Sequence, residues 1–367
     1  MDVARPELHY APAGAFHADL KRAVDGYFTR TGRSPRGGPA LALQGLLLLA
    51  WLGASWGLLV LGHPGPVAAV LLAVSCGLAV AGIGFDVMHD ANHGSASTRR
   101  WVNRLLGYSL DLIGGSSWLW RHKHNVLHHT WPNVAGLDTD GDAGAFLRLA
   151  PTQPLRRAHR WQWLYAWPLY GLFAVKWWLA DDYRELVTGR IGGHPFARPR
   201  GWDLALVLLG KAAFYGWAIV VPFALHPTWA ALGLWLLAAA TAGLVLSTVF
   251  QLAHCVGDAA HPDARGGLAL AEDWATHQVH ATVDFARGNR FLGWYVGGLN
   301  FQVEHHLFPA VSHVHYRALS PLVEAVCRLH GVRFVARPTL GAALRANVRW
   351  LRALGRPPEL VPPAAPA

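Results

Sequence analysis

The chain has 367 residues, of which 53% are hydrophobic and only 15% are charged, and its formal net charge is +10. Because a water-soluble domain normally carries about 25% charged residues, this composition excludes an ordinary soluble protein and indicates a membrane protein. The sequence has no basic patch with interleaved base-stacking aromatics. The positive charge therefore indicates membrane topology and contact with anionic lipids, and not nucleic-acid binding.

The N-terminal part of the chain is polar and lacks the early apolar core of a cleavable signal peptide. We therefore expect residues 1–40 to remain as a cytosolic segment. Within it, residues 18–28 are predicted to form a short amphipathic helix that lies on the membrane surface.

Four long apolar segments are predicted to span the membrane, at residues 41–61, 66–88, 203–225 and 228–250. Each has about 20 residues or more, which is enough to cross a hydrocarbon core of about 30 Å. The links within the two pairs are very short, so we expect two helical hairpins. Lys211 is the one basic residue in these spans. We expect it to snorkel to the cytosolic headgroups, with an inward-facing role as the alternative.

The segment between the hairpins is expected to hold interfacial helices at residues 101–120 and 162–180, with membrane spanning as the alternative for the second. Three aspartates, Asp138, Asp140 and Asp142, lie in a glycine-containing loop, for which we expect a solvated turn.

The basic residues predict the orientation of the chain. Six precede the first span, 14 lie between residues 89 and 201, 11 follow residue 250, and the hairpin tips have none. The positive-inside rule then places both termini, the middle segment and the histidine clusters described next in the cytosol. If the chain is bacterial, the membrane is the cell inner membrane.

Histidines with helix-compatible spacing gather in three clusters on this side, and another histidine follows the fourth span. Residues i and i+4 of an α-helix share a face, so a His-x-x-x-His pair can grip one metal. A typical zinc site uses three or four protein ligands, so a set of eight imidazoles favours two metals. The set is His89 and His93, then His124, His128 and His129, then His305 and His306, together with His254.

These clusters resemble, in order and spacing, the three histidine boxes of the membrane fatty-acid desaturases. Gln302 in place of the first histidine of the third box, followed by Leu-Phe-Pro at 307–309, resembles the front-end and bacterial linoleoyl-CoA desaturase-like branch. The resemblance runs from about residue 16 to residue 316. It implies an all-α integral membrane protein with four transmembrane helices and a cytosolic helical cap that carries the boxes. It further implies two iron ions that use O₂ and two electrons to remove two hydrogens from an acyl chain.

The resemblance also implies the ligand set. The box histidines hold the irons, and His254 adds a contact, as a histidine at this place does in related acyl-CoA desaturases. Gln302 is then a weak oxygen ligand, a water-mediated contact or an empty position, and His277 is a candidate to compensate for it. Asp86, Asp90 and Glu304 are candidates for hydrogen bonds to the imidazole N–H groups, with a solvated or merely structural role as the alternative.

No haem or flavin motif is present, and residues 1–40 are too short for the fused haem domain of many front-end desaturases. We therefore expect no bound haem or flavin, and a separate electron carrier, either a ferredoxin or a b-type cytochrome with its reductase. The substrate is expected to be a fatty acyl-CoA or a membrane acyl-lipid, held in an apolar tunnel that runs past the metals between spans two and four.

The expected catalytic domain covers residues 41–330, followed by a peripheral tail at 331–367. A hydroxylase or other monooxygenase on the same scaffold is the alternative enzyme. A membrane metal transporter is a remote alternative, because it predicts polar ligands near the middle of the spans, which are almost free of them.

Overall fold

The computed structural model describes residues 8–140, 143–263 and 270–357. Helices make up most of these residues. The strands among them are two-residue pairs: β1 (Arg190–Ile191) is antiparallel to β2 (His194–Pro195), and β3 (Asp284–Phe285) is parallel to β4 (Ala336–Arg337). The all-α prediction is therefore confirmed.

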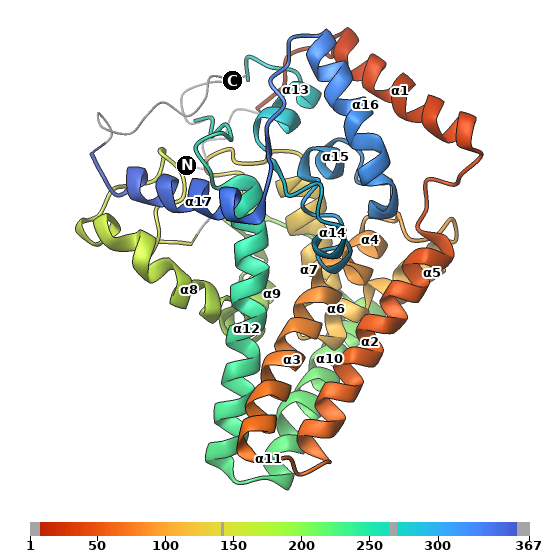
Figure 1. Ribbon diagram of the computed structural model, residues 1–367. Coiled ribbons are helices and arrows are strands. Elements are labelled where there is room, and N and C mark those ends of the chain that lie inside the picture. Colours follow the sequence, from red (N-terminus) through yellow and green to blue (C-terminus); the bar gives the residue numbers. More distant parts are fainter. Residues whose placement is uncertain (1–7, 141–142, 264–269, 358–367) are drawn as a thin grey trace.

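Four helical segments are long and apolar enough to cross a membrane, and Figure 1 shows them running together as a stem. Their ends lie within a few residues of the predicted ends, except where the second and fourth continue to Asn92 and His254. The stem comprises α2 (Gly38–Val60), α3 (Pro66–Phe85) with α4 (Val87–Asn92), α10 (Trp202–Tyr215) with the π-helix η4 (Gly216–Val220) and α11 (Val221–Leu225), and α12 (Thr228–His254).

Small residues let the stem helices approach closely. Helix α3 packs against both α2 and α12. A Cβ atom added to Gly77 of α3 would lie 2.4 Å from the carbonyl oxygen of Ala238 on α12. Glycine is therefore required there for the two backbones to meet, and Ala79 and Ala242 are buried near this contact.

The remaining helices form a head at one end of the stem (Figure 1). They are α1 (Ala15–Thr31), α5 (Arg100–Gly107), α6 (Ser109–Leu112), α7 (Ser117–Trp120), the π-helix η1 (Arg121–His128), the 3₁₀-helix η2 (Arg157–Trp161), α8 (Gln162–Lys176), the π-helix η3 (Trp177–Asp181), α9 (Asp182–Thr188), α13 (Trp274–His280), α14 (Arg290–Tyr295), α15 (Gln302–Leu307), the 3₁₀-helix η6 (His313–His315), α16 (Tyr316–Leu329) and α17 (Leu340–Leu354).

The amphipathic helix predicted at residues 18–28 forms as α1, but its apolar face does not lie on the membrane. Phe16, Leu20 and Val24 are buried, and α1 packs against α13 and α16. Pattern alone cannot distinguish a membrane surface from a protein surface, since both bury an apolar stripe. The segment predicted as a peripheral tail likewise contains α17, which buries Trp350 and Leu351 against α8 and α12.

Lys211 does not snorkel to the headgroups. It is only 4% exposed, and its Nζ donates to Asp182 Oδ2 at 2.5 Å and to the carbonyl oxygen of Gly114 at 2.7 Å. The charge is satisfied inside the protein because α9 brings a carboxylate to α10.

Candidate metal centre

The histidine cluster lies where the stem meets the head, on the ends of four separate helices. Helix α3 ends at Phe85, and the short helix α4 that follows carries His89, with His93 as its C-terminal cap. His254 is the last residue of α12. The second box lies on and just after η1, and the third lies on α15.

The spacing of the second box predicted an α-helix, but the structure has a different helix there. The box lies on a π-helix, in which the backbone N–H of His129 bonds the carbonyl oxygen of His124 five residues earlier, at 2.9 Å. This wider turn puts His129 on the face of His124, and their Nε2 atoms are 3.2 Å apart. Single π turns are frequent at functional sites, and this one brings all three imidazoles of the box into the cluster.

The imidazoles form overlapping groups in which one nitrogen of each ring lies within 4.8 Å of the others. One group is His89, His93, His124 and His305; a second is His128, His254 and His306; and a third, His129, His305 and His306, joins them. All eight predicted histidines are thus brought together. Like Nε2 of His124 and His129, Nε2 of His89 and Nε2 of His124 lie close together, at 3.3 Å.

In several rings the outer nitrogen, Nδ1, which faces away from the centre of the cluster, makes a hydrogen bond. Nδ1 of His128 faces Asp138 Oδ2 at 3.0 Å, and Nδ1 of His124 faces Asp140 Oδ2 at 3.1 Å. Nδ1 of His306 lies 2.9 Å from Gln278 Oε1. Carboxylate and amide oxygens can only accept hydrogen bonds. These contacts therefore place the proton on Nδ1 of each ring and leave the lone pair on Nε2.

The inward nitrogens fit a metal. Nε2 of His93, His128, His305 and His306 is buried without a hydrogen-bond partner. Two ligands bonded to one metal at about 2.0–2.1 Å lie roughly 2.9–3.4 Å apart, which is the spacing of the His124–His129 and His89–His124 pairs. A cation bound among these nitrogens would satisfy the buried and unpaired ones as well as the close pairs.

Burial keeps most of these rings neutral. It lowers the pKa of His93 to about 3, with His128 acting in the same direction. Burial, reinforced by neighbouring imidazoles, also lowers the pKa of His124, His129, His305 and His306. For His128, burial is the largest influence and lowers the pKa, but Asp138 and Asp140 together raise it, and the net direction is upward. Neutral imidazole is the form that binds metals.

Gln302 and His277 differ in their relation to the cluster. The amide of Gln302 lies 2.9 Å from Nε2 of His254, and its Oε1 is buried without a partner. His277 is directed away: its Nε2 donates to the carbonyl oxygen of Pro132 at 2.9 Å, and its ring lies beside Tyr10. Among the residues that the structure describes, none of the groups of close imidazole nitrogens includes His277.

The three predicted acidic residues do not bond the box imidazoles. Asp90 accepts from Ser312 Oγ at 2.5 Å and from His313 Nδ1 at 3.1 Å, and the oxygens of Asp86 have no hydrogen-bond partner, with His313 Nε2 at 3.8 Å. Burial and the adjacent Asp284 raise the pKa of Glu304 well above its usual range.

The acidic partners of the cluster were missed by sequence reasoning. Asp138, expected in a solvated turn, is only 9% exposed, and it also accepts the backbone N–H of Asn133 at 2.9 Å. Burial raises the pKa of Asp138, but His128 and the Asn133 N–H, with His254, together lower it to about 2. The rarity of acidic residues in this chain, 22 of 367, is the signal that could have drawn attention to Asp138 and Asp140. Asp142 lies outside the described residues.

Comparison with known proteins agrees with this geometry. The profile of the fatty acid desaturase family matches residues 64–338. The chain is 36% identical over 361 residues to the sn-1 linoleoyl-lipid 6-desaturase of Arthrospira platensis, covering 98% of each chain. It is 35% identical to the protein of the same name from Synechocystis sp., over 95% of this chain and 98% of that one. The acyl-lipid (8-3)-desaturase of Physcomitrium patens is 36% identical over 95% of this chain and 74% of its own length. With its buried histidine groups and its four membrane-spanning helices, the chain belongs to the fatty acid desaturase family.

Proposed function

We propose that this desaturase introduces a double bond into the acyl chain of a membrane lipid, using two irons held by the histidine cluster. The observation that carries the proposal is the set of buried Nε2 atoms that face one another without a hydrogen-bond partner. Such atoms cost free energy unless a cation binds them, so the fold is built around a ligand.

The two main groups suggest how the ligands divide. His89, His93 and His124 would hold one iron, and His128, His254 and His306 the other. His129 and His305 lie between the groups and complete the set. Imidazole ligands suit iron, and redox chemistry excludes zinc as the working metal. When bound, the iron pair supplies the activation of O₂ that breaking an unactivated C–H bond requires.

The side chains around the cluster orient the imidazole ligands, balance charge and exclude water. Asp138 and Asp140 fix the rings of His128 and His124 in one tautomer, as carboxylate–histidine pairs do at metal sites. Gln302 orients His254 through the 2.9 Å contact and is not proposed as a replacement ligand. We also leave His277 out of the proposed ligand set, because its Nε2 donates to the carbonyl oxygen of Pro132. Asp90 acts through Ser312 and His313, at a distance from the metals.

The overall reaction needs an external source of electrons. Two hydrogens from the acyl chain, one O₂, two electrons and two protons give the alkene and two waters. We propose that a ferredoxin or b-type cytochrome with its reductase supplies the electrons from the cytosol. The head and the cluster would lie on that side, since the basic residues flank the spans there.

We propose an acyl-lipid, and not an acyl-CoA, as the substrate. The support comes from the relatives: two that align over nearly their full length are named for linoleoyl-lipid, and a third is named an acyl-lipid desaturase.

The test is to express the chain in a host that makes few polyunsaturated lipids, feed defined fatty acids, and analyse each lipid class by gas chromatography and mass spectrometry. We expect products lighter by two hydrogens in glycerolipids before they appear in the CoA pool. Products heavier by one oxygen would identify a hydroxylase. Purified protein should hold close to two irons per chain; one zinc and no iron, after reconstitution with iron, would contradict the metal assignment.

A further inference from the structure

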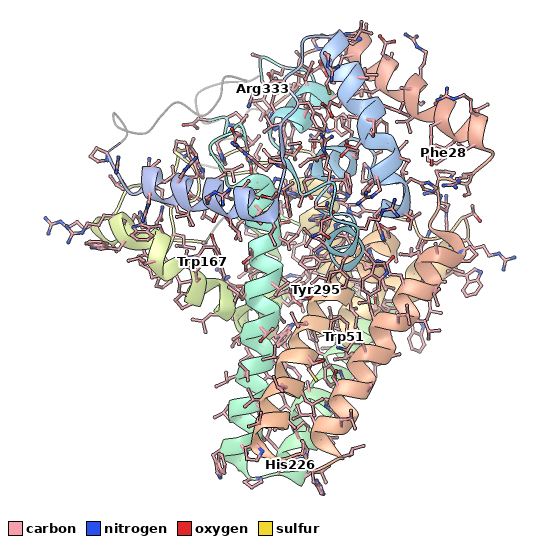
Figure 2. The ribbon with its side chains drawn as sticks, in the orientation of Figure 1. Phe28, Trp51, Trp167, His226, Tyr295 and Arg333 are labelled. Carbon is pink, nitrogen blue, oxygen red and sulfur yellow. The ribbon has the colours of Figure 1, made fainter. Side chains whose placement is uncertain are left out.

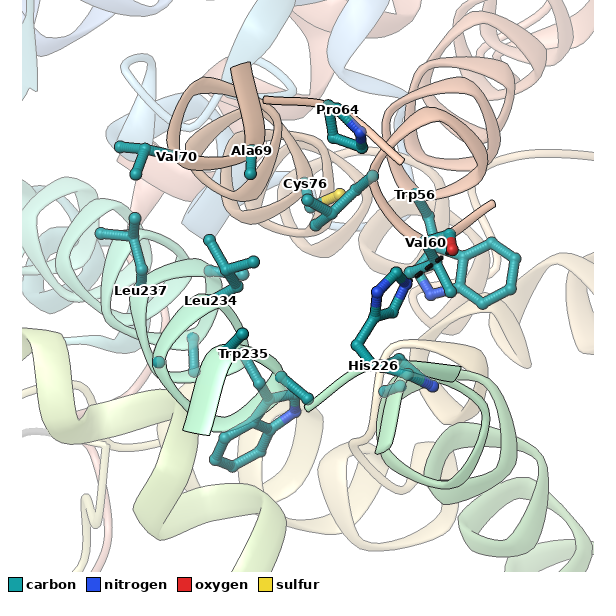
Figure 3. A pocket seen from close by; sticks show the side chains of 18 of the residues that line it. Trp56, Val60, Pro64, Ala69, Val70, Cys76, His226, Leu234, Trp235 and Leu237 are labelled. Atoms are coloured by element: carbon teal, nitrogen blue, oxygen red, sulfur yellow. Dashed lines mark hydrogen bonds between the residues drawn. The ribbon is translucent and has the colours of Figure 1, made fainter. Parts of the chain in front are cut away.

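A cavity of about 600 Å³ lies between the stem helices, in the half of the stem remote from the histidine cluster. One side comes from the adjacent helices α3, where Ala69 and Cys76 line it, and α12, where Ala231 and Leu234 line it; the third span lines another side with Ala218 and Pro222. Figure 3 shows an open centre with Cys76 and Leu234 on one side and Trp56 and His226 on the other. Between Ala69 and Val80 the cavity follows about 16 Å of helix axis, at ~1.5 Å per residue.

The cavity is suited to hydrocarbon. Most of its lining is alanine, leucine, valine, tryptophan and proline. Two of its polar groups are already engaged, since His226 Nε2 donates to the carbonyl oxygen of Val60 at 2.7 Å and Trp56 Nε1 donates to that of Trp217 at 3.1 Å. An apolar space of this kind holds water poorly, and its volume is within the usual range for a small-molecule site.

A packed layer separates the cavity from the histidines. Going along α3 from Val80 towards His89, the side chains of Ile83 and Met88 are buried in the same apolar core as Leu110 and Ile113. These residues are at most 2% exposed. The tunnel predicted from sequence would run past the metals, whereas this cavity lies beyond a close-packed layer and is a different space.

The other end of the cavity lies at the tip of the stem. That end is lined by His63 and Pro64 from the link between α2 and α3, by His226 from the link between α11 and α12, and by Trp229 from the first turn of α12. Figure 2 shows His226 at the tip, opposite Arg333 in the head. Trp229 is 80% exposed, as expected of an aromatic ring at the level of the lipid headgroups. The cavity thus ends where the tails of the leaflet remote from the head begin.

We propose that this cavity binds one acyl tail of a bilayer phospholipid, inserted from the leaflet remote from the head. The stem crosses the membrane, so hydrocarbon tails are the molecules in contact with this end of the cavity. The tail would fill the space that α3 and α12 leave open towards the third span, and would hold the two links at a fixed separation. The inference does not depend on the identity of the substrate or of the metal.

The proposal can be tested by photo-crosslinking. The full chain is reconstituted in vesicles that contain a trace of a phosphatidylcholine with a diazirine near the end of one tail, and the labelled peptides are mapped by mass spectrometry. We expect adducts within residues 69–80 and 231–239. Ala231→Phe fills the cavity and should remove these adducts. Leu232→Phe is the control: it introduces the same residue at the next position, which is 44% exposed and does not line the cavity, and its adducts should remain.

Ala69→Phe fills the cavity from α3 and guards against a folding defect peculiar to one variant. Size-exclusion elution and bound iron identify the variants that remain folded. Equal labelling of wild type and both folded filling variants, or wild-type labelling restricted to lipid-exposed residues, would overturn the proposal. A shift of the products of Ala231→Phe towards shorter acyl chains would also overturn it, because it would assign the cavity to the substrate's own tail.

Discussion

Two buried polar clusters lie close to the junction of stem and head, and they differ in whether their polar atoms are satisfied. In the Lys211 cluster, the ammonium bonds Asp182 and the carbonyl of Gly114, and Asp182 also accepts from Trp177 Nε1 at 2.9 Å. In the histidine cluster, the Nδ1 atoms of His128 and His306 are bonded, but several Nε2 atoms have no partner. A buried cluster that satisfies itself stabilises the fold, whereas one left open towards its centre is prepared for a ligand.

The strongest test of this difference removes one inner imidazole. His128→Ala and His306→Ala should each abolish turnover and lower the iron content, because each removes a proposed ligand. Helicity and membrane insertion should remain, because the four spans are apolar whether or not a metal is bound. Lipid analysis, elemental analysis and circular dichroism measure the three properties. Full iron content with no activity would mean that these rings act on the substrate and not on the metal.

Removing one partner of the Lys211 cluster should affect stability instead. Lys211→Met leaves Asp182 buried without its cation, which costs about 3–5 kcal/mol. The double change Lys211→Met with Asp182→Leu should recover part of that loss, and activity per folded molecule should change little in either protein. Thermal unfolding in detergent measures stability. A loss of iron from the folded single variant would mean that the two clusters are coupled.

The outer bonds of the histidine cluster should have an intermediate effect. Asp138→Asn keeps the shape but removes the charge that orients His128, and loss of such a partner typically lowers metal affinity or activity by about 10- to 100-fold. Asp258→Asn is the matched control, because Asp258 pairs with Arg337 away from the cluster. Similar activity in the two variants would remove the carboxylate from the proposed site.

Gln302 should contribute less. Its single contact with His254 is worth about 0.5–1.5 kcal/mol, so Gln302→Leu should lower activity by roughly two- to tenfold. Gln302→His restores a nitrogen or hydrogen-bonding atom there and should retain more activity than the leucine variant. If leucine matches wild type in rate and iron content, the residue only packs.

The smallest effect on turnover is expected at the tip of the stem. His63 lies there beside His226, at a ring separation of 5.7 Å, roughly a membrane thickness from the cluster. His63→Ala should leave iron content and turnover close to wild type, as measured by the same assays. A loss of iron in this variant would show that His63 affects the histidine cluster from the far end of the stem.

Local patterns predicted the stem and the eight histidines because both leave a signal in consecutive residues. Uncharged runs of span length identify the stem helices, and four-residue spacings identify the histidine clusters. The π-helix was not predictable in this way, since its sequence is also compatible with an α-helix. That one change of turn decides that His129, and not His128, lies closest to His124.

Other features depend on contacts between distant residues. Lys211 meets a carboxylate 29 residues earlier in the chain, and His128 meets Asp138 in a loop without regular structure. The face of α1 is apolar whichever surface it meets, so only the packing of α16 shows that it belongs to the head. Sequence identified the residues that matter most, but the protein's tertiary contacts decide which atoms they bond.

Helix α12 is unbroken from Thr228 at the tip to His254 in the cluster, whereas the second span bends at Asp86 before it reaches His89. An unbroken helix of this length carries any tilt to its end, at about 0.7 Å of displacement per degree for a rise of ~1.5 Å per residue. Transmembrane helices tilt more in thinner bilayers, so the thickness of the host membrane is transmitted directly to His254 and only indirectly to His89. The distance between the His89 group and the His254 group of imidazoles therefore depends on the lipid around the protein as well as on its sequence.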